Sequence, residues 1–369
     1  MIREEINEIK KQFNKDTNVI TKYAGCYVDA EKNIKFMTKD AFYSLPEEDA
    51  FKYEEIFRKT LSGAVGKSLL TLDFSIDEEG EDTPHAFLMK LRESRLDDEL
   101  ILDEFFRKVI DAYEYAENYY IILVDMMYDI PGKSSDKLAM DDASNEVYHG
   151  LLCSICPVTL SKPALSYFAN EGVIANRIRD WIVGMPMHGF LFPAFTDRTT
   201  DIHAALYFSK KNDALNESFI NEIIGVNPPM SSVMQKETFE AVLYDVLRDE
   251  LTMPVMSALS SNMLDLIAEN SDNPEPLVLT KNDMVKLISK SGVSDEAVES
   301  YEKSADADIE VLADNVVDTR KFEVKTPGIT VKTDTDSIEK LETRVIDGRK
   351  YLLVPIEDDV EVNGMPVKA

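Results

Sequence analysis

Seven ionisable residues lie in two short segments beside apolar stretches of the chain, and their types suit acid–base chemistry. A histidine next to a carboxylate can act as a general base, and arginines can hold an anionic substrate through charge-assisted hydrogen bonds. The alternative is a structural network of Asp–Arg pairs that fixes a loop between two buried strands, since structural ion pairs cluster in the same way. We favour the structural interpretation. The seven candidates are Arg177, Arg179, Asp180, Asp197, Arg198, Asp201 and His203.

The elements that must position these residues follow from the local pattern. Apolar and polar residues alternate over 201–208, which predicts a strand. We expect the side chains of Asp201 and His203 on the face of that strand opposite to its apolar residues. Residues 197–200 should form the preceding turn, which we expect to lie within reach of the arginines of the first segment.

Residues 63–68, GAVGKS, end like a phosphate-binding loop. That loop needs a glycine two residues before this block so that backbone N–H groups can surround the phosphates, and Leu61 stands there instead. The loop should also connect a strand to a following helix, whereas here a predicted helix precedes a predicted strand. We therefore do not predict a nucleotide site.

Two further motifs have the spacing of metal or redox sites, and both are incomplete. Cys153 and Cys156 lie in an apolar strand pattern, where side chains three residues apart point to opposite faces. A four-thiolate zinc site would need a second pair, which Cys26 alone cannot supply. Glu146 and His149 match half of a carboxylate-bridged site that requires two copies on helices. We expect buried structural cysteines, no metal and no cofactor.

Residues 286–301 have the rhythm of a helix-turn-helix motif. The second helix of such a motif enters the DNA major groove and must tolerate phosphates. From Asp295 to Asp318, however, there are nine acidic residues and one basic residue, Lys303. Coulomb repulsion opposes docking on DNA. We predict a two-helix corner that packs or binds protein.

The balance of acidic and basic residues limits the classes of binding partner that we expect. The 369 residues include 40 basic and 69 acidic side chains, which leaves a net charge of −29. Such a surface repels nucleic-acid backbones and anionic membranes, so we expect neither as a partner. A protein partner with a basic surface is compatible with it. The pattern leaves the oligomeric state open.

Three cysteines are an odd, low number that suits a reducing compartment rather than a disulfide framework. The first fifteen residues mix charges with spaced apolar residues and lack the apolar core of a signal peptide. We expect a soluble cytoplasmic protein.

Periodicity predicts an α+β fold with a mixed, largely antiparallel sheet. We expect a mixed α+β domain at residues 1–228, a helical segment at 229–308 and a small C-terminal β unit at 309–369. Asp347-Gly348 and Asn363-Gly364 are strong hairpin signals within the last unit. The order of strands in the sheet does not follow from these patterns.

Five blocks of the sequence resemble one uncharacterised bacterial family. They are AGCYVDAEKN at 24–33, TLSG at 60–63, LCSICPVTLSKP at 152–163, IRDWIVGMPMHGFLFPAFTDRTTDIHAALYF at 178–208 and ETRVIDGRKYLLVPIEDDVEVNG at 342–364. The resemblance spans nearly the whole chain. It implies a cytoplasmic protein of unknown function from low-GC Gram-positive bacteria, and it supplies no catalytic residue.

Two functional classes follow. The first is an acidic binding or adaptor protein without catalytic activity, which the incompleteness of every motif favours. The second is an enzyme of unknown reaction that acts on an anionic small molecule through the Asp/Arg/His cluster. Convergence of these residues in a concave pocket would favour the enzyme.

Overall fold

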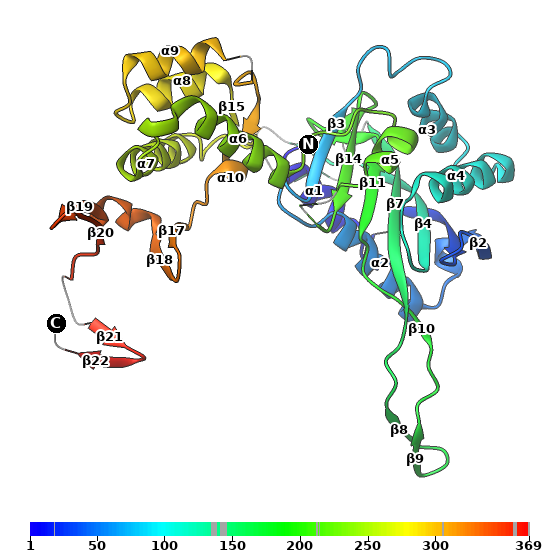
Figure 1. Ribbon diagram of the computed structural model, residues 1–369. Coiled ribbons are helices and arrows are strands. Elements are labelled where there is room, and N and C mark those ends of the chain that lie inside the picture. Colours follow the sequence, from blue (N-terminus) through cyan, green and yellow to red (C-terminus); the bar gives the residue numbers. More distant parts are fainter. Residues whose placement is uncertain are drawn as a thin grey trace. The chain divides into compact units, whose positions relative to one another are not determined.

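The computed structural model describes residues 1–17, 19–133, 139–140, 146–211, 213, 215–304, 306–356 and 360–367 (Figure 1). The chain divides into two compact units, Met1–Ser231 and Ser232–Ala369. Helices and antiparallel strand pairs occur in both, so the predicted α+β class is confirmed.

The first unit is built on one antiparallel sheet, with the order β2-β1-β4-β7-β11-β14-β3 and with β10 beside β7. Its hairpins and longer connections join strands that all run antiparallel to their neighbours, as predicted for most of the sheet. The strands are β1 (Ile20–Val28), β2 (Ile34–Ala41), β3 (Leu69–Asp73), β4 (Tyr119–Asp129), β7 (Val147–Leu160), β10 (Trp181–Val183), β11 (His188–Phe192) and β14 (Ala204–Ser209).

Helices cover both faces of this sheet, which explains why β4 is apolar along most of its length. Ile121 and Leu123 face one hydrophobic core, and Ile122 and Val124 face the other. The first core is closed by α3 (Pro84–Glu93), α4 (Glu99–Ala112), α5 (Glu217–Phe219) and the π-helical turn η3 (Ile220–Ile224). The second is closed by α1 (Arg3–Lys11), the short η1 (Phe42–Ser44) and α2 (Glu47–Thr60).

A short connection at residues 94–98 separates α3 from α4. Asp98 caps α4 by accepting hydrogen bonds from the backbone N–H groups of Leu100 and Ile101, at 2.9 and 3.2 Å. Arg95 and Leu96 in the connection have φ angles of 49° and 58°. Non-glycine residues adopt this left-handed region at a cost, so the surrounding packing must hold the connection in place.

Three small hairpins complete the first unit: β5 (Gly132–Lys133) with β6 (Ala139–Met140), β8 (Leu165–Phe168) with β9 (Val173–Asn176), and β12 (Ala194–Thr196) with β13 (Thr199–Asp201). The turn predicted at 197–200 is shorter than expected: Asp197 and Arg198 form it between β12 and β13, with positive φ angles, and residues 199–200 already belong to β13.

The continuous strand predicted over 201–208 is wrong at its start. β13 ends at Asp201, residues 202–203 form a turn, and β14 begins at Ala204. The cause is local: Oδ1 of Asp201 accepts a hydrogen bond from the backbone N–H of His203 at 3.1 Å, and such side-chain bonds compete with the strand ladder.

The second unit has a helical core followed by hairpins. The core comprises α6 (Ser232–Leu247), η4 (Arg248–Glu250), α7 (Met253–Glu269), β15 (Val278–Leu279), α8 (Lys281–Ser289), α9 (Asp295–Lys303), β16 (Val311–Leu312) and α10 (Ala313–Val316). The hairpins are β17 (Lys321–Thr326) with β18 (Ile329–Asp334), β19 (Glu342–Ile346) with β20 (Arg349–Leu353), and β21 (Val360–Val362) with β22 (Met365–Val367). The short η5 (Thr335–Lys340) connects the first two hairpins.

Several local predictions for this unit are confirmed. α8 and α9 form the predicted two-helix corner, and Ala297 and Tyr301 of α9 are buried in the helical core. Asp347-Gly348 and Asn363-Gly364 form the predicted hairpin turns, each with two positive φ angles. The division of the chain at residue 308 stays a prediction.

Within the described ranges, none of the helices combines the length and the apolar character that crossing a bilayer requires.

Candidate functional site

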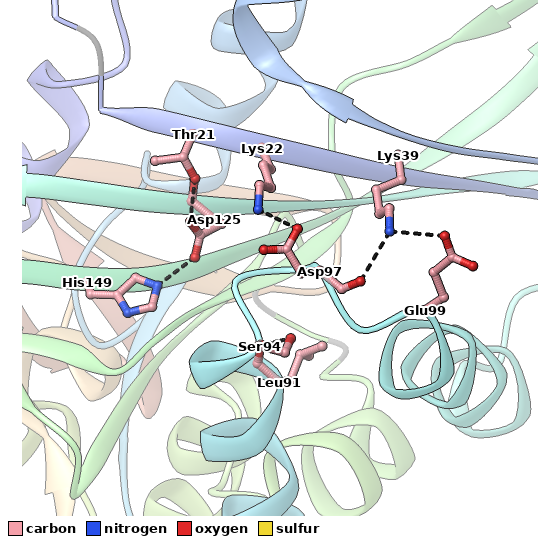
Figure 2. Close-up of polar contacts among 9 residues, drawn as sticks. All are labelled: Thr21, Lys22, Lys39, Leu91, Ser94, Asp97, Glu99, Asp125 and His149. Atoms are coloured by element: carbon pink, nitrogen blue, oxygen red, sulfur yellow. Dashed lines mark hydrogen bonds and ion pairs between the residues drawn. The ribbon is translucent and has the colours of Figure 1, made fainter.

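A buried polar cluster of the first unit centres on Asp125 of β4, whose side chain is 1% exposed (Figure 2). Nε2 of His149, on β7, lies 2.6 Å from its Oδ1. The hydroxyl of Thr21, on β1, donates a hydrogen bond to its Oδ2. Three neighbouring strands therefore bring together residues from three parts of the sequence around one carboxylate.

This arrangement fixes the tautomer of His149. An ionised carboxylate can only accept hydrogen bonds, so Nε2 of His149 is the donor in this contact. In many acid–base sites, a buried Asp orients the imidazole of the catalytic histidine in this way. The same contacts also give the buried carboxylate its hydrogen-bond partners. That role is purely structural, because a buried polar group without partners would destabilise the fold.

Basic side chains and the α3–α4 connection cover this cluster. Nε of Arg92 donates to the backbone oxygen of His149 at 2.7 Å, and burial lowers the pKa of Arg92. Figure 2 shows Lys22 and Lys39 reaching from the sheet to the connection, where Lys22 pairs with Asp97 at 2.6 Å. Nζ of Lys39 contacts Glu99 at 3.3 Å. The Asp–His pair thus has one part-buried arginine beside it, and the two lysines nearby are paired with acidic residues.

In each of the two motifs with metal-site spacing, the two side chains lie in different surroundings. Cys153 and Cys156 are buried on opposite faces of β7, as predicted, and burial raises the pKa of both thiols. Glu146 accepts from the hydroxyl of Thr199 at 2.5 Å, whereas His149 binds Asp125. Among the residues that the structure describes, no three His, Cys, Asp or Glu side chains are grouped to hold a metal ion.

Asp197 and Arg198 form a turn that helix α1 holds in place. The backbone N–H of Asp197 donates to Glu5 at 2.6 Å, and the guanidinium of Arg198 contacts Glu8 at 2.8–3.1 Å. The hydroxyl of Tyr128 also donates to Glu8, at 2.9 Å. The sequence interpretation did not include the two glutamates. Their only signal is a spacing of three residues on the first helix, which places both on one side of it.

His203 lies in the turn after β13 and is exposed. Its Nδ1 is 2.6 Å from Oε1 of Glu79, and this hydrogen bond is the main cause that raises the pKa of His203. Asp201 contacts the backbone of His203 and adds a smaller charge effect. The structure therefore brings Asp201 and His203 together, with Glu79 as a partner that sequence reasoning missed.

Arg177, Arg179 and Asp180 lie in a third place, beyond the far end of β7. Nε of Arg179 donates to the backbone oxygen of Ser161 at 2.7 Å, and the backbone N–H of Asp180 donates to the Ser161 hydroxyl at 3.1 Å. The Asp197–Arg198 turn lies near the start of β7, and this 14-residue strand is roughly 45 Å long. The structure does not bring these two groups together.

The arm, residues 162–183, continues β7 and returns through β10 (Figure 1). The β8–β9 hairpin forms its outer part, and Gly172, with a φ of 68°, completes the turn at its tip. No residue of the arm is buried. Its large apolar side chains are among the most exposed of the chain: Leu165 74%, Tyr167 67%, Ile174 69% and Ile178 72%.

The arm presents these side chains on a defined face. In the register of the hairpin, Tyr167 pairs with Ile174, and Leu165 lies two residues from Tyr167 on the same face. An exposed apolar patch on a projecting element is typical of an interaction site. All four residues of β9 are exposed, so neither face of that strand is covered.

The family described as a domain of unknown function (DUF4317) matches residues 1–365. No curated protein matches the chain.

Proposed function

We propose that this chain, which belongs to the DUF4317 family of unknown function, is a protein-binding protein that engages its partner through the arm. The observation that carries the proposal is the exposure of Leu165, Tyr167, Ile174 and Ile178 on a hairpin that projects from the sheet. This is the adaptor class that the sequence favours.

The physical argument is the free energy of burial. Removing a large aliphatic or aromatic side chain from water contributes about 1.5–3 kcal/mol. An isolated two-stranded ribbon is only marginally stable in water, because each strand has one neighbour and neither face is covered. A partner that covers the apolar face of the arm gains this burial and orders the ribbon.

Site-specific photo-crosslinking in the cell tests the proposal. A photoreactive residue at Ile174 should yield covalent adducts of defined mass with protein. The matched control is Ile76, which is exposed outside the arm. Adducts at Ile174 but not at Ile76 support binding by the arm. Equal labelling at both positions, or none at Ile174, would contradict it.

A second candidate function rests on the Asp125–His149 pair. The oriented imidazole and the nearby Arg92 suit general-base chemistry on an anionic small molecule. Within the described part of the chain, Nδ1 of His149 has no hydrogen-bond partner. This cluster differs from the one predicted from sequence and belongs to the same chemical class.

Thermal shifts with a panel of small anions test this alternative. A ligand of the site should raise the melting temperature of the wild type and of His203→Gln, which changes an exposed histidine. The same ligand should not stabilise His149→Gln. If every anion affects the three proteins equally, the acid–base candidate is wrong.

Three finer expectations accompany the main proposal. The free, buried cysteines support a cytoplasmic location. The sequence blocks quoted above support an origin in low-GC Gram-positive bacteria. The acidic surface supports a protein partner rather than nucleic acid or membrane. We also keep the division of the C-terminal part at residue 308, which limited proteolysis between residues 304 and 320 would test.

A further inference from the structure

We propose that the first unit holds a binding site for a small organic cation, in a pocket where the buried carboxylate of Glu54 is the acceptor. The ligand class is a molecule that joins an ammonium group to an apolar body. The residues of this pocket lie outside the arm, so the inference goes beyond the proposed protein-binding function.

The pocket lies between the end of α1, the short η1 and the first half of α2, and has a volume of about 610 Å³. Ile20, Phe42 and Leu45 form part of its apolar lining. The rings of Tyr43 and Phe51 also line it and are exposed. A concave, largely apolar site of this size suits one small molecule, which a few polar groups then orient.

Glu54 of α2 lines the pocket, and its side chain is only 7% exposed. Among the described residues, its carboxylate has one partner: Oε2 lies 3.5 Å from Nη1 of Arg58. The same Nη1 also donates a hydrogen bond to the backbone oxygen of Phe13. Oε1 of Glu54 therefore has no hydrogen-bond donor within the described chain, whereas buried polar groups normally have partners. A ligand in the pocket can supply that donor.

Arg58 compensates the charge of this carboxylate only in part. Burial raises the pKa of Glu54, and the charge of Arg58 lowers it by less. Burial and, to a smaller extent, the charge of Glu54 raise the pKa of Tyr43, which also lines the pocket. An ammonium that donates to Glu54 would form a charge-assisted hydrogen bond in surroundings of low dielectric constant, where such bonds are strong.

The exposed charges at the rim of the pocket cancel. Lys15 and Lys52 balance Glu47 and Glu48, and all four are exposed to solvent, which screens them. The rim therefore favours neither a cation nor an anion. The preference for a cation comes from the buried carboxylate of Glu54.

Three uncharged polar side chains of the pocket already have partners in the backbone. Gln12 and Asn14 donate to backbone oxygens of α1 at 3.1 and 2.6 Å, and Thr17 donates to a backbone oxygen at the end of this helix. These bonds hold the segment after α1 in place as a wall of the pocket. They leave Glu54 as the buried group that selects the ligand.

Ligand-observed NMR titration of the purified full chain tests the inference with three probes of similar size that share a phenyl ring. The probe 2-phenylethylammonium is a cation, 2-phenylethanol is neutral and 3-phenylpropanoate is an anion. The ammonium should bind at least about tenfold more tightly than the alcohol, which is the factor expected for one charge-assisted hydrogen bond. The anion should bind most weakly.

Two variants separate the roles of the carboxylate and the wall. Glu54→Gln keeps the shape of the side chain and removes its charge, so it should abolish the preference for the ammonium over the alcohol. Glu114→Gln is the matched control, because Glu114 is exposed and does not line the pocket. Tyr43→Ala removes an exposed ring of the wall and should weaken the binding of both probes by a similar factor.

The inference is overturned if the alcohol or the anion binds the wild type as tightly as the ammonium, or if Glu54→Gln keeps the preference for the ammonium. Lack of ammonium binding at millimolar concentration, the range expected for a probe of this size, also overturns it. If Glu54→Gln does not fold, ammonium binding that Tyr43→Ala leaves unchanged has the same meaning. The proposed function fails separately, because it is tested by crosslinks from Ile174.

Discussion

Strand β7 and the arm that continues it use similar apolar residues in opposite environments. Within β7, Leu152, Cys153 and Ile155 are fully buried between two layers of helices. In the arm, Tyr167 and Ile174 pair in the same antiparallel geometry and remain exposed. The comparison teaches that an apolar strand pattern has two explanations. Where the fold covers the residues, the pattern serves stability. Where it does not, the proposed protein-binding function gives the pattern a role.

The largest expected loss of stability concerns a buried residue of the sheet. Phe190 of β11 is 0% exposed and lies in the first core, so Phe190→Ala should lower the free energy of unfolding by about 3–5 kcal/mol. Phe36→Ala is the matched control, because Phe36 of β2 is 57% exposed. Urea denaturation measures both. Equal losses would show that burial in this sheet does not determine stability.

A smaller effect is expected at the polar cluster within the same sheet. Asp125→Ala leaves the N–H of His149 and the hydroxyl of Thr21 without their acceptor, which should cost about 1–3 kcal/mol of unfolding free energy. Asp125→Asn should cost less, because the amide keeps the shape and one acceptor oxygen. Chemical denaturation of the two variants checks this. A larger loss for the amide would contradict the hydrogen-bond argument.

The pair between His203 and Glu79 should contribute a smaller, pH-dependent stability. The folded-state pKa of His203 is raised above its usual value near 6.5, so the protonated ring is the form that the pair stabilises. The contribution is complete below about pH 6.5 and is lost as the pH rises through the higher folded pKa.

Thermal melts of the wild type and His203→Gln test this window. The wild type should melt higher at about pH 6 and equally at about pH 9. Glu79→Gln should reproduce the loss, because it removes the other partner. A difference between wild type and variant that grew toward alkaline pH would have the wrong sign for this pair.

The smallest expected effect on stability concerns an exposed residue of the arm. It is the most direct test of the difference between the arm and the buried sheet. Ile174→Ser should change the free energy of unfolding by no more than about 0.5 kcal/mol, because the side chain has no buried contact to lose. Ile122→Ser on β4 should destabilise strongly, since Ile122 is fully buried. If both variants lost stability equally, the arm would be packed in solution and the proposed function would need another surface.

Much of the secondary structure could be predicted, because its causes are local. Local patterns predicted the helix that precedes residues 63–68 and the helical segment of the second unit, and Asp347-Gly348 predicted a hairpin turn from the conformational preference of its residues. The strand over 201–208 was wrong at its start because a single side-chain bond of Asp201 displaced the ladder. Alternation alone does not reveal such a bond.

The candidate site could be predicted only in part. Asp201 with His203, and Asp197 with Arg198, are neighbours in sequence and remain together in the structure. Their main partners come from distant segments: Glu79 precedes His203 by 124 residues, and Glu8 precedes Arg198 by 190 residues. Such pairs depend on the order of strands and on helix packing, which local patterns do not specify.

The sequence by itself determined the α+β class, the acidic surface, the opposite orientation of Cys153 and Cys156 and the main hairpin turns, because each depends on neighbouring residues or on composition. Tertiary structure alone decided that Asp125 meets His149 and Thr21, since β1, β4 and β7 are adjacent only after the sheet has formed. It also decided that the apolar residues of the arm are exposed. Burial depends on what packs against a strand, and in the outer hairpin of the arm Tyr167 and Ile174 remain 67% and 69% exposed.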